Sequence, residues 1–191
     1  FARRAVSTAS AASSPLRTIL FYRDFKTVLV LDRLLNLVNT IDLRRQQIFQ
    51  VRTVCLGYDN SIWVFDEQDS KLRKVAENGT LLRETADLRL VLGEAPVPTR
   101  MTDQSRFVYM YDPQKGMYIF DYYGTLKQKL PIIGWADLQV FGNTIVGRKD
   151  GKLLRYTTGT LQLEERVLPA FLRDAENIQL AHQGIFVLDA E

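Results

Sequence analysis

The sequence has few of the residues on which cross-linking and nucleophilic catalysis depend. Its 191 residues include one cysteine, Cys55, and one histidine, His182. A single thiol forms no disulfide within the chain, and Cys55 lies in an apolar run typical of a small, buried core residue. No stretch approaches the roughly 20 apolar residues that a membrane-spanning helix needs. We therefore expect neither a disulfide scaffold nor a membrane span.

The chain also lacks a strong excess of one charge. Its net charge of +3 comes from 25 basic and 22 acidic residues. Proteins that bind nucleic acid usually cluster their excess of Lys and Arg. The only pairs of adjacent arginines are Arg3-Arg4 and Arg44-Arg45. Nucleic acid is therefore not an expected partner.

No acidic residue precedes Asp24, and Ser and Ala fill most of positions 5–14. An acid-free start with Arg and Ser is typical of an organelle transit segment. The spacer left after removal of a secretory signal is an equally good interpretation. We expect residues 1–16 to be disordered or processed, and residues 17–191 to form the folded domain.

An internal repeat is the strongest signal in the chain. A short apolar strand that ends in an acid occurs five times, and the acids are 42, 46, 38 and 39 residues apart. A period near 40 is the length of one four-stranded propeller blade. The acids that end these strands are Asp24, Asp66, Asp112, Asp150 and Asp189.

Each repeat continues in the same way after its acid. A second apolar strand follows, then a turn, and the triplet Gly-Thr-Leu begins at Gly79, Gly124 and Gly159. A further strand precedes each repeat, for example Val51–Leu56 and Pro98–Thr102. Gly and Asn tolerate the positive φ of tight hairpin turns, and the β-branched and aromatic content favours strands. The unit is thus four strands joined by three turns.

These features resemble the β-propellers with weak repeats, such as the NHL-like and YVTN-like families. The resemblance covers roughly residues 18–191 and implies an all-β propeller-type fold of about four to five four-stranded antiparallel blades. Trp63 is followed by Val64, so the tryptophan–aspartate signature is absent. Four units and one final strand favour an open or incomplete ring, whose free edge would pair with more chain or with a partner. The chain also resembles secreted or envelope-associated bacterial propellers.

Candidate catalytic and metal sites are sparse. A Cys55–His182 pair would need the fold to bring a strand and a distant turn together, so no catalytic residue is predicted. The five strand-ending acids could in principle ring a Ca²⁺ ion, but none has the dense spacing of a calcium loop. We expect them instead to bind backbone amides. Asn78-Gly79-Thr80 fits a glycosylation acceptor, although a hairpin turn explains it fully.

The candidate partner-binding residues are expected on the face that carries the connections between units. They include Arg44 and Arg45 in one long connection, the acids Asp66 and Asp112, and Trp135 in another loop. Packing between neighbouring blades is the alternative role for Trp135. Tyr122-Tyr123 falls in a turn, and exposed aromatic residues are enriched at interaction surfaces.

The sequence therefore predicts a chain that is not an enzyme and holds no cofactor or metal. Its expected role is a non-catalytic protein-interaction or scaffolding propeller, an accessory subunit of an envelope or membrane-associated complex. Its expected location is secreted, periplasmic or at the outer envelope. The alternatives are a metal-dependent propeller hydrolase or lactonase, with a central metal held by Asp and Asn, and an incomplete fragment.

Overall fold

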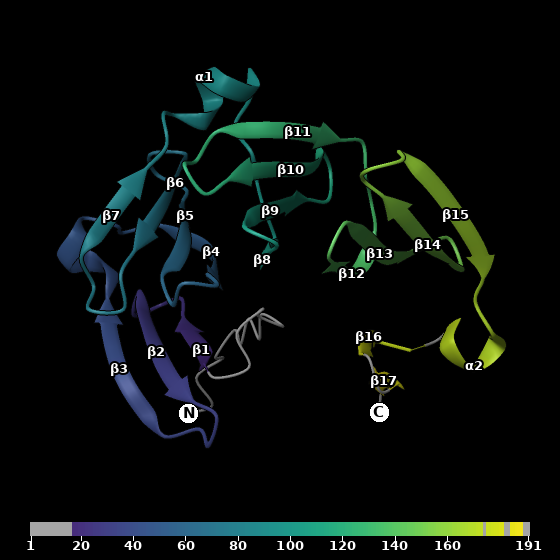
Figure 1. The fold of residues 1–191 in the computed structure, drawn as a ribbon, viewed down its shortest axis with the longest axis horizontal. Helices are drawn as coiled ribbons and strands as arrows, with labels where there is room; N and C mark the ends of the chain where they lie inside the picture. Colours follow the sequence, from purple (N-terminus) through teal and green to yellow (C-terminus); the bar gives the residue numbers. More distant parts are fainter. Residues whose placement is uncertain (1–16, 174, 182–183, 189–191) are drawn as a thin grey trace. The chain divides into compact units, whose positions relative to one another are not determined.

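A computed structural model describes residues 17–173, 175–181 and 184–188. In this part the chain forms antiparallel sheets in which each strand pairs with a strand adjacent in the sequence (Figure 1). The predicted N-terminal segment, residues 1–16, lies outside the described residues. The chain divides into two compact units, Phe1–Ile133 and Gly134–Glu191.

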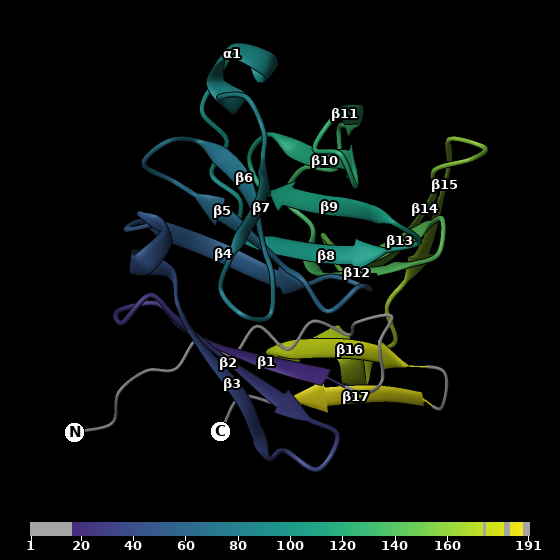
Figure 2. The ribbon, with the colours of Figure 1, turned by 60° about the vertical axis from the view of Figure 1, so that its left-hand side comes forward.

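The first unit holds three sheets. The first consists of β1 (Arg17–Tyr22), β2 (Thr27–Asp32) and β3 (Leu37–Asp42), which lie side by side in Figure 2. The short 3-10 helix η1 (Leu43–Gln46) follows. In the repeat, β1 takes the place of the strand that precedes the acid. The first sheet therefore has no counterpart of the unit's opening strand within the described residues.

The next two sheets of this unit are complete four-stranded meanders. One contains β4 (Val51–Leu56), β5 (Ile62–Asp66), β6 (Lys71–Val75) and β7 (Leu81–Glu84), and the helix α1 (Leu88–Leu92) follows it. The other contains β8 (Arg100–Gln104), β9 (Phe107–Asp112), β10 (Gly116–Asp121) and β11 (Leu126–Leu130). The opening strands β4 and β8 are neighbours.

The second unit holds a third complete meander and a hairpin. The meander consists of β12 (Ala136–Phe141), β13 (Thr144–Lys149), β14 (Lys152–Thr157) and β15 (Gln162–Val167). The short helix α2 (Ala170–Arg173) leads to the hairpin of β16 (Asn177–Ala181) and β17 (Gly184–Leu188). The described residues thus contain three of the expected four-stranded sheets, one three-stranded sheet and one two-stranded sheet.

The second sheet is apolar on both faces because it is covered on both sides. Side chains alternate across a strand, so Ile62 and Val64 of β5 join the core shared with the first sheet. Trp63 and Phe65 join the core shared with the third sheet. This double burial explains why β5 reads as an uninterrupted apolar run.

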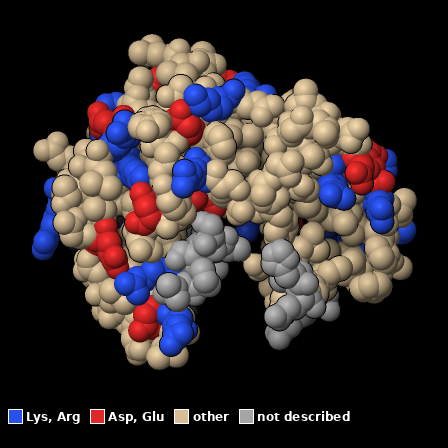
Figure 3. All heavy atoms as spheres, viewed as in Figure 1, with Lys and Arg blue, Asp and Glu red and all other residues tan. Residues whose placement is uncertain are grey.

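Charge is distributed without large regions of one sign on the face drawn in Figure 3. Basic and acidic side chains are interspersed there, as the nearly balanced composition leads one to expect. No helix in the described part of the chain is long and apolar enough to cross a membrane.

Gly116, at the start of β10, is a position where the fold requires glycine. Its φ is +109°, and a Cβ there would lie 2.2 Å from the carbonyl oxygen of Leu130 in β11. We expect Gly116→Ala to lower the free energy of unfolding by about 2 kcal/mol more than Gly93→Ala does. Gly93 also has a positive φ, +75°, but a Cβ there would meet no atom within 4 Å. Urea unfolding of both variants measures this difference, and equal losses would contradict the close approach.

Candidate functional site

The acids Asp66 and Asp112 end β5 and β9, and both are buried. Asp66 accepts a hydrogen bond from the amide of Gln68 (3.1 Å), and Asp112 accepts one from the amide of Gln114 (2.9 Å). The other oxygen of Asp112 accepts from the amide of Val97 (2.7 Å). The predicted binding of strand-ending acids to backbone amides is therefore confirmed at these two positions. A direct role in binding a partner would require both carboxylates to leave these bonds.

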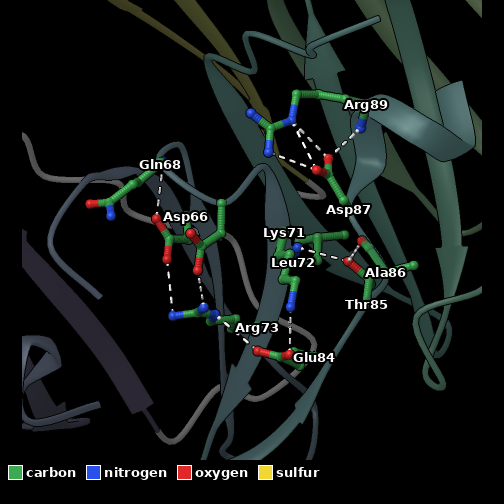
Figure 4. A network of polar contacts seen from close by, with 11 residues as sticks. Asp66, Gln68, Lys71, Leu72, Arg73, Glu84, Thr85, Ala86, Asp87 and Arg89 are labelled. Carbon is green, nitrogen blue, oxygen red and sulfur yellow. Dashed lines mark hydrogen bonds and ion pairs between the residues drawn. The ribbon is translucent and has the colours of Figure 1, made fainter. Parts of the chain in front are cut away.

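Asp66 also belongs to a buried ion-pair network, which Figure 4 shows. Arg73 on the neighbouring strand β6 lies 3.0 Å from Asp66 and 3.3 Å from Glu84. It is also paired with Asp69. Burial raises the pKa of Asp66, and the charge of Arg73 opposes this rise. The network ties together the second, third and fourth strands of this sheet.

The remaining predicted partner-binding residues belong to different units, Arg44 and Arg45 to the first and Trp135 to the second. Arg44 and Arg45 are both exposed on η1, where Arg44 forms a two-pronged ion pair with Asp42 (2.7 Å between Nη2 and Oδ2). Trp135 belongs to the second unit and is only 8% exposed. Its ring covers Gly147 of β13, where a Cβ would lie 3.0 Å from the ring. Trp135 thus packs inside the protein, and this contact is with a strand of its own sheet and not with a neighbouring blade.

Two other predictions have definite outcomes. Cys55 is a fully buried free thiol, as expected, and burial raises its pKa well above the ordinary value. The Asn78 carbonyl accepts from the amide of Thr80 (3.0 Å), so Asn78-Gly79-Thr80 is a turn. The positions of His182 and Asp189 lie outside the described residues. Within the described residues no group of three His, Cys, Asp or Glu side chains is arranged to hold a metal.

A pocket of about 510 Å³ lies where the turns of the second and third sheets meet. We call it the tyrosine pocket. Its lining comes from the β4–β5 turn, β6, β7, the β8–β9 turn, the start of β9 and the β10–β11 turn. The lining residues are Tyr58, Asp59, Lys74, Arg83, Ser105, Arg106, Phe107, Asp121, Tyr122 and Tyr123.

Beneath the pocket lies a buried acid, Asp103 of β8. Its Oδ2 accepts a hydrogen bond from the hydroxyl of Tyr122, whose oxygen accepts in turn from the amide of Tyr58 (3.0 Å). Burial raises the pKa of Asp103 to about 6, although the hydrogen bond from Tyr122 acts against this rise. Burial and the Asp103 carboxylate together raise the pKa of Tyr122. Oδ1 of Asp103 is buried and accepts no hydrogen bond from the described residues.

One wall of the pocket is a cross-strand row on the second sheet. Trp63, Lys74 and Arg83 are opposite one another on β5, β6 and β7. Lys74 is 8% exposed, and its ammonium lies 2.6 Å from Asp59 and 4.1 Å from the centre of the Tyr122 ring. Burial acts to raise the pKa of Asp59, but hydrogen bonds from Lys74 and Ser61 outweigh it and lower that pKa. The Asp59 carboxyl is therefore ionised at neutral pH.

The rim of the pocket is aromatic and cationic. The guanidinium of Arg83 lies 5.2 Å from the centre of the Tyr123 ring, and that of Arg106 lies 5.7 Å from the centre of the Tyr58 ring. Tyr58 and Tyr123 are 42% and 72% exposed. Aromatic rings and guanidinium groups are the side chains that contribute most to binding at protein interfaces.

Local turn chemistry places these side chains. Oδ1 of Asp121 accepts from the amides of Tyr123 and Thr125 (2.9 Å each), which fixes the turn that projects Tyr122 and Tyr123. On the other side, a Cβ at Gly57 would lie 2.8 Å from the Tyr122 hydroxyl, so glycine allows the two turns to approach.

The arrangement is suited to binding. Its floor is held by hydrogen bonds and an ion pair, whereas its rim offers polar and aromatic surfaces to a ligand. The exposed Tyr122-Tyr123 turn was visible in the sequence. Asp103, Lys74 and Arg106 were missed because each lies on a different strand or turn. Two adjacent basic residues inside the apolar strand Lys71–Val75 were the one signal for Lys74.

Solved structures with similar folds include proteins of several kinds. Streptogramin B lyase matches with a TM-score of 0.64 and 15% identity, over 97% of this chain and 64% of the lyase. PorZ of Porphyromonas gingivalis matches with a TM-score of 0.62 and 12% identity, over 96% of this chain and 26% of PorZ. The WD40 β-propeller domain of Doa1 matches with a TM-score of 0.59 and 13% identity, over 90% of this chain and 56% of that chain.

The comparison corrects one prediction. The chain was expected not to be an enzyme because it has a propeller-type repeat and lacks a visible catalytic constellation. That inference is wrong, because this fold also occurs in an enzyme, streptogramin B lyase. At 15% identity the likeness shows the fold alone, so the architecture gives no ground for classing the chain as a non-enzyme.

No protein-family model matches the sequence, and no curated protein does. The chain spans 64% of the length of the lyase chain that it matches. Consecutive four-stranded antiparallel meanders and the similarity to solved propellers agree with the predicted fold. The chain is an all-β protein of the β-propeller type with weak repeats.

Proposed function

We propose that this chain is a protein-interaction propeller whose partner binds in the tyrosine pocket. The observation that carries the proposal is the rim, where Tyr58 and Tyr123 are exposed beside Arg83 and Arg106. A volume of about 510 Å³ is within the usual range for ligand pockets. The ordered floor favours affinity because fewer side chains must be immobilised when the partner binds.

The setting that we propose is an envelope or membrane-associated complex, with the chain secreted, periplasmic or at the outer envelope. PorZ, one of the proteins of similar fold, is described as a bacterial surface component of the type IX secretion system. This likeness supports the setting by analogy of fold.

The face that carries Arg44 and Arg45 remains a second proposed surface, with Asp66, Asp112 and Trp135 as its other predicted members. We favour the tyrosine pocket over it. Asp66 and Asp112 are buried and bound to their own backbone, and Trp135 is almost fully buried. Only the two arginines of this set are exposed.

Affinity capture from native extract tests which of the two surfaces binds the partner. It compares three matched forms of the protein. We expect the wild-type protein to retain a stoichiometric partner, and Tyr58→Ala/Tyr123→Ala to bind that partner at least tenfold more weakly. Arg44→Ala/Arg45→Ala should bind it as the wild type does. All four side chains are exposed, so circular dichroism and melting temperature should be nearly unchanged. Retention by the tyrosine variant with loss by the arginine variant would move the partner to the other face.

A further inference from the structure

Among the side chains that line the tyrosine pocket, three are basic and two are acidic, so the charges of the lining do not cancel. Lys74 is paired with Asp59 (2.6 Å). Asp121 has partners as well, because its Oδ1 accepts from two turn amides and its Oδ2 lies 3.0 Å from the ammonium of Lys127. The guanidinium groups of Arg83 and Arg106 are then left without an acidic partner among the described residues.

These two arginines differ from most others in the described part of the chain. Seven of the other arginines bind carboxylates within the protein, whereas Arg83 and Arg106 lie against tyrosine rings. A guanidinium stacked on a ring keeps its N–H edge free to bind a carboxylate with two parallel hydrogen bonds. The arginines paired with carboxylates are Arg17, Arg44, Arg52, Arg73, Arg89, Arg148 and Arg155.

The backbone conformation of the β8–β9 turn determines where the Arg106 side chain lies. Ser105 and Arg106 have φ values of +53° and +66°, the left-handed conformation of a tight hairpin. Such positions favour Gly, Asn or Asp, and an arginine there is unfavourable for the fold. The turn places the Arg106 side chain at the pocket rim, where it faces solvent.

We infer that the tyrosine pocket binds an acidic peptide segment, with one carboxylate bound by Arg83 and another by Arg106. This inference rests on the proposed function, since the segment belongs to the partner protein. Apolar atoms of the segment lie on the exposed faces of Tyr58, Tyr123 and Phe107. The Lys74–Asp59 pair holds the floor and binds no part of the segment directly.

Isothermal titration calorimetry with two blocked synthetic peptides tests the inference. One contains Glu-Tyr-Glu between glycines, and its counterpart contains Gln-Tyr-Gln. We expect the acidic peptide to bind at least tenfold more tightly, and its affinity to fall as salt is raised from 20 to 200 mM, because exposed charges are screened. Inorganic phosphate alone is the third probe, and it should bind more weakly than the acidic peptide.

Arg83→Gln and Arg106→Gln should each weaken binding of the acidic peptide by roughly tenfold. Their affinity for the neutral peptide should not change. Arg45→Gln, an exposed arginine outside the pocket, is the matched control and should bind as the wild type does. Equal affinity for both peptides, absence of binding, wild-type binding by the Gln variants, or phosphate bound as tightly as peptide would each overturn the inference.

The two proposals fail in different ways. The captured partner could be lost with Tyr58→Ala/Tyr123→Ala but kept with Arg83→Gln/Arg106→Gln. In that case the pocket is the binding site, but the inference that it binds an acidic segment is wrong. If both double variants keep the partner, the proposed function itself is wrong.

Discussion

Replacing Arg73 by methionine is expected to lower the free energy of unfolding by about 3–5 kcal/mol. Arg73 is 7% exposed, and its partner Asp66 is fully buried. The only charged group that reaches Oδ2 of Asp66 is this guanidinium, at 3.0 Å, and that oxygen has no hydrogen bond within the described residues. The substitution would leave a buried carboxylate without compensation. Urea unfolding at pH 7 measures the loss.

Two further variants separate loss of the ion pair from loss of packing. Arg83→Met, on the adjacent strand β7, removes an exposed arginine and should change stability by less than about 0.5 kcal/mol. Asp66→Asn combined with Arg73→Met should recover part of the loss, because the double variant leaves no buried charge unpaired. A loss below about 1 kcal/mol for Arg73→Met would show that water or a rearranged side chain replaces the guanidinium.

Asp103→Asn is expected to raise the free energy of unfolding at pH 7 by up to about 3 kcal/mol relative to the wild type. The folded-state pKa of Asp103 is about 6, raised from the ordinary value of 3.8 by burial. Keeping the carboxylate ionised in the folded protein therefore costs free energy at neutral pH. The amide oxygen of Asn still offers Tyr122 an acceptor for its hydroxyl.

The raised pKa of Asp103 determines how the stability difference between Asp103→Asn and the wild type changes with pH. Between pH 3.8 and about 6 the folded state holds the Asp103 proton and the unfolded state releases it, so wild-type stability falls as pH rises through this window. The advantage of Asp103→Asn should therefore vanish near pH 4 and be complete above pH 6. The charged and titratable groups around Asp103 are Asp59, Lys74, Tyr122 and Cys55.

Asp121→Asn is the matched control, and its effect on the free energy of unfolding at pH 7 should be opposite to that of Asp103→Asn. Burial acts to raise the pKa of Asp121, but the turn amides and Lys127 outweigh it and lower that pKa. Its stabilising contribution is present at neutral pH and is lost as pH falls, so this variant should be less stable than the wild type at pH 7. Thermal unfolding of the three proteins from pH 4 to 8 measures both trends. A constant difference between Asp103→Asn and wild type would contradict a raised pKa for Asp103.

Strand order was predictable because the fold depends on local pairing. The acids at a spacing near 40, and the glycine turns after them, gave the order of the meanders correctly. Strand β8 was less predictable. Its predicted range was Pro98–Thr102 with a turn at Asp103, but the strand continues through Asp103 to Gln104. Asp103 is tolerated inside this strand because its carboxylate accepts a hydrogen bond from the hydroxyl of Tyr122, which lies in a turn distant in the sequence.

Helix α1 was not predicted from the sequence because it is short. Asp87 caps it by accepting from the amide of Arg89 (2.9 Å), and Gly93 ends it with a φ of +75°. Both signals are present in the sequence, but five residues are too few for helical periodicity to stand out. The buried side chain of Leu88 explains the position of helix α1, because it joins the core between the second and third sheets.

The site was less predictable than the fold. A turn with two tyrosines suggested a surface for binding, and the structure places both in the pocket lining. Its cationic side is built by pairing across strands, which brings Lys74 next to Arg83 and both near Arg106. Contacts between turns of different repeats leave no periodic trace in a single sequence.

The meander topology also bears on how the protein is made. Every strand finds its partner within the same stretch of about 40 residues. A ribosome completes such a stretch in roughly two to eight seconds, whereas a hairpin closes in microseconds. Each sheet can therefore finish its ladder while the next is still being translated. During synthesis, the nascent chain therefore exposes the unpaired strand edge of only one incomplete sheet at a time. The need for chaperones should be greatest at that exposed edge.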